Sequence, residues 1–310
     1  MQSIFQYIID YVRSLDKWLF AITALFVASL IFINYRFGIE GRIQLLPYRW
    51  QRFTGFYLLY ATAFILPYIF LAFSRSDLKF PGSFLVLILV APAIFAAKVT
   101  AGGWISLVPG NALPHWKKYY KIITDLPVRL LIIVISLWLV KHFWKYDGSF
   151  WGLTTKNFDF RPYFIMLLIM LPLIAFASTQ HDFLQTYPKM KQVAFISAHS
   201  SSSWFYKLLF ELSYGIDFIS IELFFRGFLV IAFVRYAGAG AILPMAAFYC
   251  SIHFGKPLLE CISSFFGGIL LGIITYNTQT ILGGLMVHLG IAWMMEIGGY
   301  WGNVLRVRSR

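Results

Sequence analysis

Residues 221–229 of the sequence read IELFFRGFL, a stretch in which one acid and one base interrupt an otherwise apolar run. Glu222 and Arg226 are four residues apart, so on a helix both side chains lie on one face, one turn apart. Inside a membrane an ionisable side chain is costly, and it usually faces the interior of a helix bundle or a wet cavity. We therefore expect the fold to be organised around this stretch.

The composition is typical of a membrane protein. Of the 310 residues, 59% are hydrophobic and 13% are charged, whereas a soluble domain has about 25% charged and 45–50% apolar residues. The apolar residues occur in blocks that are long enough to cross a bilayer. We predict an all-α fold, a polytopic transmembrane helical bundle with eight or nine spans and the lipid bilayer as its surroundings.

The positive charge is distributed between the apolar blocks. The net charge of +13 lies on the short segments that join the blocks, which is typical of lysines and arginines at a membrane surface and argues against nucleic acid as a partner. The basic segments after the first block, before the fourth block and at the C-terminus can share one side of the membrane. The positive-inside rule then predicts a cytoplasmic C-terminus and an N-terminus outside.

We predict two regions in the chain. Residues 1–203 form an N-terminal transmembrane region with short basic loops, and residues 204–310 form a core that carries the ionisable groups. The apolar blocks of the first region are 18–35, 56–73, 84–97, 127–143 and 163–178. The second region contains a helix over 204–236 and spans over 242–254, 258–276 and 281–300.

Cysteine usage predicts no disulfide framework. The chain has two cysteines, Cys250 and Cys261, and both lie in or beside apolar segments. Such positions are typical of reduced, buried thiols.

Glu222 and Arg226 allow two interpretations. One is a structural ion pair that ties one helix turn or joins two helices, although burial makes such a pair expensive unless it is well hydrogen-bonded. The other is a carboxylate that acts as a general base on water, with Arg226 keeping it ionised and oriented.

Two histidines follow in equally apolar surroundings, His253 near a predicted helix end and His288 within a predicted span. A lone histidine near a helix end is often a satisfied residue at the membrane interface. Two intramembrane histidines on separate helices, together with Glu222, can also bind a metal, polarise a water or relay protons. The residues alone leave these alternatives open.

Three motifs occur in order in the last third of the chain: Glu222-x-x-x-Arg226-Gly227, Tyr249-x-x-x-His253, and FGGILLG at 266–272, which leads to His288. Together they resemble the CPBP family, the CAAX-protease and bacteriocin-processing (Abi) membrane peptidases. The resemblance covers about residues 205–300, and the segment 151–153 (WGL) resembles a feature found upstream in that family.

The resemblance implies an intramembrane, glutamate-dependent endopeptidase that cleaves a peptide or protein substrate at the membrane, in the bacterial inner membrane. It implies that Glu222, Arg226, His253 and His288 are catalytic. Because the family is often classed with the metalloproteases, it also implies a divalent metal such as zinc on Glu222, His253 and His288.

Two departures from the family pattern bear on activity. Ile221 stands where the family has the first glutamate of a Glu-Glu pair, and Ala292 stands where it has Asn or Asp. Ile221 cannot accept a proton from water. The loss of one oxyanion donor, as expected at Ala292, alone lowers a rate by about 100–1,000-fold. The first alternative is therefore an impaired endopeptidase. The second is a non-proteolytic relative of the same fold, either a membrane scaffold or an immunity- or secretion-associated protein. A transporter or proton channel would use the same buried groups, but no obvious pair of broken helices supports it.

Overall fold

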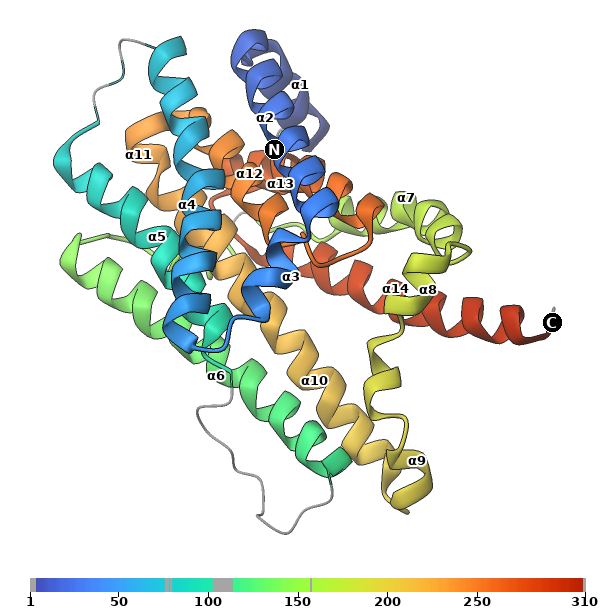
Figure 1. The fold of residues 1–310 in the computed structure, drawn as a ribbon. Coiled ribbons are helices and arrows are strands. Elements are labelled where there is room, and N and C mark those ends of the chain that lie inside the picture. Colours follow the sequence, from blue (N-terminus) through green and yellow to red (C-terminus); the bar gives the residue numbers. More distant parts are fainter. Residues whose placement is uncertain (1–3, 76–77, 79, 103–113, 157, 309–310) are drawn as a thin grey trace. The chain divides into compact units, whose positions relative to one another are not determined.

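The computed structural model describes residues 4–75, 78, 80–102, 114–156 and 158–308 (Figure 1). Every regular element within these ranges is a helix, which confirms the predicted all-α fold. The first two thirds of the chain contain α1 (Ile4–Ser14), α2 (Lys17–Phe37), α3 (Ile39–Gln44), α4 (Arg49–Ser74), α5 (Gly82–Thr100), α6 (Pro114–Phe143), α7 (Arg161–Ala177), α8 (His181–Thr186), η1 (Lys189–Val193) and α9 (Ile196–His199). The last third contains α10 (Ser203–Glu222), η2 (Leu223–Ala232), α11 (Val234–Ala237), η3 (Gly238–Ala241), α12 (Ile242–Ser251), α13 (Leu258–Thr278) and α14 (Leu282–Arg308).

The helices are those of an integral membrane protein. Among the described residues, six helices are long and apolar enough to cross a membrane: α2, α4, α5, α6, α13 and α14. The chain bends by 95° after α7, and a seventh span results if α7 and the helical segment after the bend count as one. The helical membrane bundle is therefore as predicted, with a span count close to the expected eight or nine.

Two of the predicted spans account for the smaller count. The helix over 204–236 begins with α10, whose apolar run is broken by four charged residues, Lys207, Glu211, Asp217 and Glu222. The span predicted over 242–254 is the ten-residue α12. At 1.5 Å per residue this helix is about 15 Å long, half of the roughly 30 Å of a bilayer core. All ten of its residues are buried, so α12 is a core helix that is too short to cross the membrane.

The chain forms two compact units. Unit 1 comprises Met1–Thr100, Ile133–Phe158 and Glu222–Leu282, and unit 2 comprises Ala101–Ile132, Asp159–Ile221 and Gly283–Arg310. Glu222, Arg226 and His253 belong to unit 1, and His288 belongs to unit 2. The division predicted at residue 203 is a separate matter and stays a prediction.

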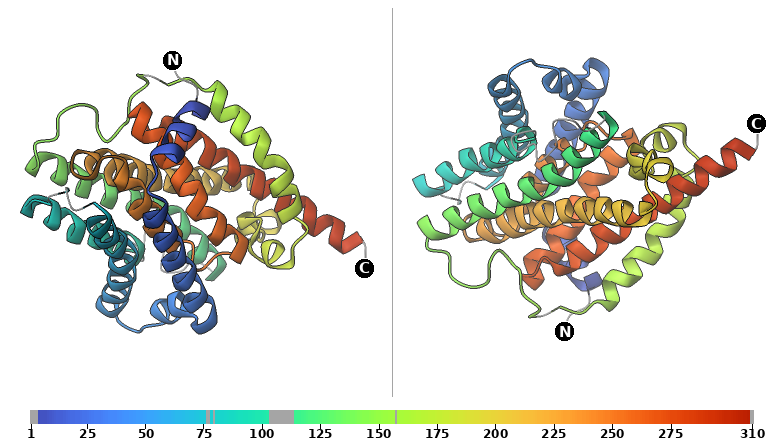
Figure 2. Two further views of the ribbon diagram at one scale, coloured as in Figure 1. Left: turned by 90° about the horizontal axis from the view of Figure 1, so that it is seen from above. Right: turned by 90° about the horizontal axis from the view of Figure 1, so that it is seen from below.

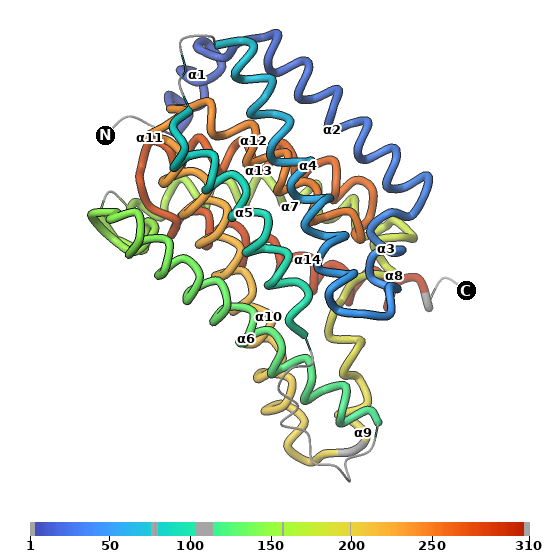
Figure 3. Tube along the Cα trace, turned by 60° about the vertical axis from the view of Figure 1, so that its left-hand side comes forward, coloured from blue at the N-terminus to red at the C-terminus, as the bar shows by residue number. Residues whose placement is uncertain are grey.

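Unit 1 is built around α12. Helices α2, α4, α13 and η2 all pack against it (Figures 1 and 2), and α4 lies beside α5 (Figure 3). Phe248 of α12 is at the centre, with its ring 5.1 to 5.8 Å from those of Tyr60, Phe64, Phe95, Phe224 and Phe225. Edge-to-face and tilted aromatic pairs of this kind add about 0.5–1.5 kcal/mol each beyond their buried area. They give η2, which carries Arg226, a closely packed support.

The two cysteines lie in this core, one on each of two packed helices. Cys250 of α12 and Cys261 of α13 are both free and buried, and their sulfur atoms are 3.9 Å apart. The predicted reduced, buried thiols are therefore confirmed.

Unit 2 relies on small residues for its helix packing. A Cβ added to Gly290 of α14 would lie 2.6 Å from Leu167 of α7, and one added to Gly298 would overlap Ser178 at the end of α7. Small residues at these positions let two helices approach closely, which is a common way of packing helices in membranes.

Candidate active site

Glu222 and Arg226 form the ion pair that their spacing predicted. Arg226 Nη1 lies 3.0 Å from Glu222 Oε1, and both side chains are fully buried. Residues Leu223–Ala232 adopt a π-helix, a wider form of helix that in proteins often marks a functional site. Burying two charges is favourable only if further contacts stabilise them, so the surroundings of the pair decide what it can do.

Tyr249 of α12 supplies one such contact. The guanidinium carbon of Arg226 lies 4.2 Å from the centre of the Tyr249 ring, a cation–π contact worth about 2 kcal/mol in a desolvated site. Phe225 meets the same ring edge-on at 5.1 Å. Tyr249, the aromatic residue of the second motif, therefore stabilises Arg226, the arginine of the first.

His253 follows directly in this series of contacts. Its Nδ1 is 2.9 Å from the backbone carbonyl oxygen of Tyr249, and its ring meets the Tyr249 ring at 4.7 Å. Because a carbonyl can only accept, Nδ1 donates, and the neutral imidazole keeps its lone pair on Nε2. A carbonyl in this place fixes both the tautomer and the orientation of a functional histidine.

The segment 151–153 supports η2 from behind. Trp151 is buried and donates its indole N–H to the carbonyl of Leu137 at 3.0 Å. A Cβ on Gly227 would lie 2.6 Å from the backbone oxygen of Trp151. Gly227 therefore permits a close backbone approach one residue after Arg226.

His288 lies in unit 2, on α14. Its ring meets the edge of Phe218 of α10 at 4.8 Å. Ala292, one turn further along α14, is buried. Within unit 1 the structure thus links the Glu222–Arg226 pair to His253 through Tyr249, whereas the convergence of His288 with them stays a prediction.

The order of these residues agrees with a known family. Residues 203–294 match the model of the family described as Type II CAAX prenyl endopeptidase Rce1-like. This segment is therefore similar to an Rce1-like CAAX prenyl endopeptidase, and for this similarity residues 203–294 are called the Rce1-like domain. The finding is consistent with the predicted CPBP family, and at the level of the family it supports a membrane protease. The match covers less than a third of the chain. The chain matches no curated protein and no solved structure.

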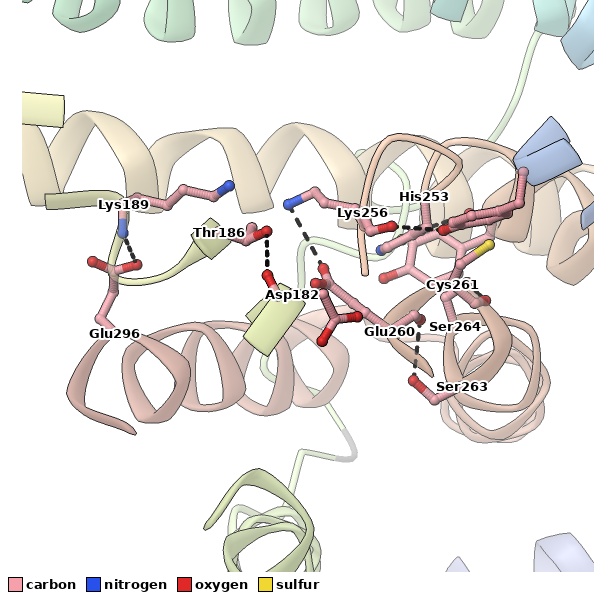
Figure 4. A network of polar contacts seen from close by, with 12 residues as sticks. Asp182, Thr186, Lys189, His253, Lys256, Glu260, Cys261, Ser263, Ser264 and Glu296 are labelled. Atoms are coloured by element: carbon pink, nitrogen blue, oxygen red, sulfur yellow. Dashed lines mark hydrogen bonds and ion pairs between the residues drawn. The ribbon is translucent and has the colours of Figure 1, made fainter. Parts of the chain in front are cut away.

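Two further acids near the Rce1-like domain motifs have structural roles. Glu260 pairs with Lys256 at 3.6 Å. In unit 2, the Glu296 carboxylate accepts the backbone N–H groups of Lys189 at 2.6 Å and Met190 at 3.1 Å, at the start of η1. Figure 4 shows both contacts, the Lys256–Glu260 pair and the carboxylate of Glu296 at Lys189.

A metal requires more donors than either unit gathers. Zinc in enzymes is held by three protein ligands, usually His, Glu, Asp or Cys. Across the described ranges, no group of three or more such side chains lies close enough to hold a metal. Within unit 1 the Glu222 carboxylate is paired with Arg226, whose positive charge opposes a second cation beside it. Neither unit by itself therefore fits a metal site, and the ligand set of Glu222, His253 and His288 stays a prediction.

Sequence reasoning missed two parts of the Rce1-like domain's surroundings. It named Tyr249 only as a motif residue, although a tyrosine one turn before His253 in an apolar helix also has a ring face for a buried cation. It gave the segment 151–153 no role, since nothing in the local sequence indicates that Trp151 lies against Gly227.

Proposed function

We propose that this protein is a membrane-embedded endopeptidase of the CPBP type, which cleaves a peptide or protein substrate at the bilayer. The observation that carries the proposal is the unbroken series of contacts from Glu222 through Arg226 and Tyr249 to His253. Burying an ion pair costs free energy. Here Tyr249 joins the pair to His253, whose tautomer is fixed. The Rce1-like domain over the same residues supports this function.

In the proposed reaction, His253 accepts a proton at Nε2 from the water that attacks the scissile carbonyl, and the imidazolium returns this proton to the leaving amine as the C–N bond breaks. The other ring proton stays on Nδ1, which donates it in a hydrogen bond to the carbonyl of Tyr249. The imidazolium that forms is therefore held in place. Glu222 acts through Arg226 rather than on water, because its carboxylate is fully buried at 3.0 Å from the guanidinium. The reaction still depends on this glutamate, since its loss leaves Arg226 without the carboxylate that orients it. His288 is the second catalytic histidine of the proposal.

A cleavage assay tests the proposal. The protein, purified and reconstituted in lipid vesicles, is given a panel of fluorescence-quenched peptides that includes prenylated C-terminal CAAX peptides, the class named in the description of the matched family. We expect cleavage by the natural chain and a loss of about 100-fold or more in His253→Gln, within the range for removal of a general base. His142→Gln is the matched control, because His142 stacks on Trp138 on the same unit but outside the series.

A second candidate function is a non-proteolytic relative of the same fold. It is favoured by Ile221 and Ala292, which place two buried apolar side chains at motif positions. The assay separates the two candidates. If the natural chain cleaves none of the peptides and the double substitution Ile221→Glu with Ala292→Asn creates activity, the chain is the non-proteolytic relative.

For location, we propose the bacterial inner membrane with the C-terminus in the cytoplasm, supported by the basic residues between the apolar blocks. A reporter fused to the C-terminus, active only in the cytoplasm, checks this orientation. Activity of a periplasm-dependent reporter at the same position would reverse it.

A further inference from the structure

The turn that carries His253 is held by side chains from the N-terminal part of the chain. This turn, residues 252–257, joins α12 to α13. Asn34 of α2, 220 residues earlier in the sequence, donates its side-chain N–H to the backbone carbonyl of Phe254 at 3.0 Å. Tyr35, its neighbour, donates its hydroxyl to the carbonyl of Lys256 at 2.6 Å. Two consecutive residues of α2 thus bond to carbonyls one and three residues after His253.

Asn34 is itself fixed in one orientation. Gly38 ends α2 in the left-handed conformation, with φ +63°, and α3 begins directly after it. This corner brings the backbone N–H of Glu40 to 2.9 Å from Asn34 Oδ1. Both polar ends of the buried Asn34 amide are therefore engaged, one by α3 and the other by the turn.

Glu40 closes the same corner against the turn. A Cβ added to Gly255 would lie 3.1 Å from Glu40 Oε2. The glycine therefore leaves room for the carboxyl group two residues after His253. Three side chains of one corner, Asn34, Tyr35 and Glu40, meet three successive residues of the turn.

The turn does not need these contacts for its local shape. Its own backbone bonds run from His253 N–H to Cys250 at 3.0 Å and from Lys256 N–H to His253 at 3.0 Å. The contacts from α2 are additional, and they satisfy a buried carbonyl that otherwise has to find another partner. Their effect is to fix where the turn lies relative to the rest of unit 1.

We propose that Asn34, assisted by Tyr35 and Glu40, is a positioning residue for His253. The corner between α2 and α3 holds the turn, and the turn holds the imidazole in register with the carbonyl of Tyr249. This gives the N-terminal membrane helices a part in the chemistry of the Rce1-like domain. The consequence for catalysis rests on the proposed function, whereas the effect on the His253 ring is independent of it.

The test reads the His253 ring directly. The protein is labelled with 15N-histidine, placed in lipid vesicles and studied by magic-angle-spinning NMR, with His253→Gln used to assign the signal. In the natural chain we expect one His253 species protonated at Nδ1. In Asn34→Ala we expect a mixture of tautomers, together with a fall in peptide cleavage of about 100-fold, the loss typical of a misplacement of about 1 Å.

Two further variants keep the test decisive. Tyr35→Phe removes one hydroxyl from a side chain that is 38% exposed. We therefore expect this variant to fold even if Asn34→Ala does not. We expect the His253 ring signal to change as in Asn34→Ala, but to a smaller extent. Ser29→Ala is the matched control on α2, because its exposed hydroxyl donates to the carbonyl of Leu25 within the same helix. We expect Ser29→Ala to match the natural chain in both measurements.

The two proposals fail in distinguishable ways. If Asn34→Ala and Tyr35→Phe both leave the His253 signal as in the natural chain, the positioning inference is wrong, whatever the activity. If the signal changes in these variants but the natural chain cleaves no peptide, the positioning inference stands and the proposed peptidase function fails.

Discussion

The Glu222–Arg226 and Lys256–Glu260 pairs of unit 1 have the same spacing but differ in burial. Glu222 and Arg226 lie 3.0 Å apart and are fully buried, whereas Lys256 and Glu260 lie 3.6 Å apart with side chains 32% and 18% exposed. In each pair the two residues are four positions apart in the sequence. The four-residue spacing allows an ion pair to form, whereas burial decides how much the pair contributes to the free energy of unfolding.

The largest expected effect comes from breaking the buried pair. In Arg226→Met the fully buried Glu222 carboxylate loses its guanidinium, so we expect the free energy of unfolding to fall by about 3–5 kcal/mol. Unfolding in mixed detergent micelles, titrated with dodecyl sulfate, measures this loss. A change below about 1 kcal/mol would show that the buried pair is no more important to stability than the half-buried Lys256–Glu260 pair.

A smaller effect is expected from the close packing behind the buried pair. In Gly227→Ala the new Cβ would lie 2.6 Å from the backbone oxygen of Trp151, and such overpacking costs about 1–3 kcal/mol. Gly267→Ala on α13 is the matched control, because a Cβ there meets nothing within 4 Å. We expect the control to be neutral or slightly more stable, since alanine favours a helix over glycine. Equal losses in both variants would contradict a specific role for Gly227.

The smallest effect is expected at the half-buried pair, Lys256 and Glu260. Lys256→Gln removes a partly solvated contact, and such pairs contribute about 0–1 kcal/mol. The same unfolding titration checks this value, and raising the salt concentration should reduce the difference further because exposed charges are screened. A loss as large as that of Arg226→Met would remove the contrast between the two pairs.

Much of this comparison could be predicted from the sequence. The placement of Glu222 and Arg226 on one face follows from helical periodicity, and their burial follows from the apolar residues around them. The helical membrane fold follows from the length and composition of the apolar blocks. These features are local, so a single sequence contains them.

The remaining features depend on contacts between distant residues. Apolar content alone could not tell that α12 is a buried core helix, because a short span and a core helix have the same composition. The approach of Trp151 to Gly227 and the bond from Asn34 to Phe254 join residues far apart in the sequence. No local pattern encodes either contact, although both determine where the candidate site residues lie.

The central claim is that the buried Glu222–Arg226 pair is kept for function rather than for stability. The double substitution Glu222→Leu with Arg226→Met tests it, because apolar residues of similar volume in place of a buried ion pair are often neutral or stabilising by about 1–4 kcal/mol. Cleavage of the most active peptide and unfolding are measured on the same preparation. We predict stability equal to or above that of the natural chain and a fall in cleavage of about 100-fold or more. Full cleavage by the stable double variant would contradict the claim.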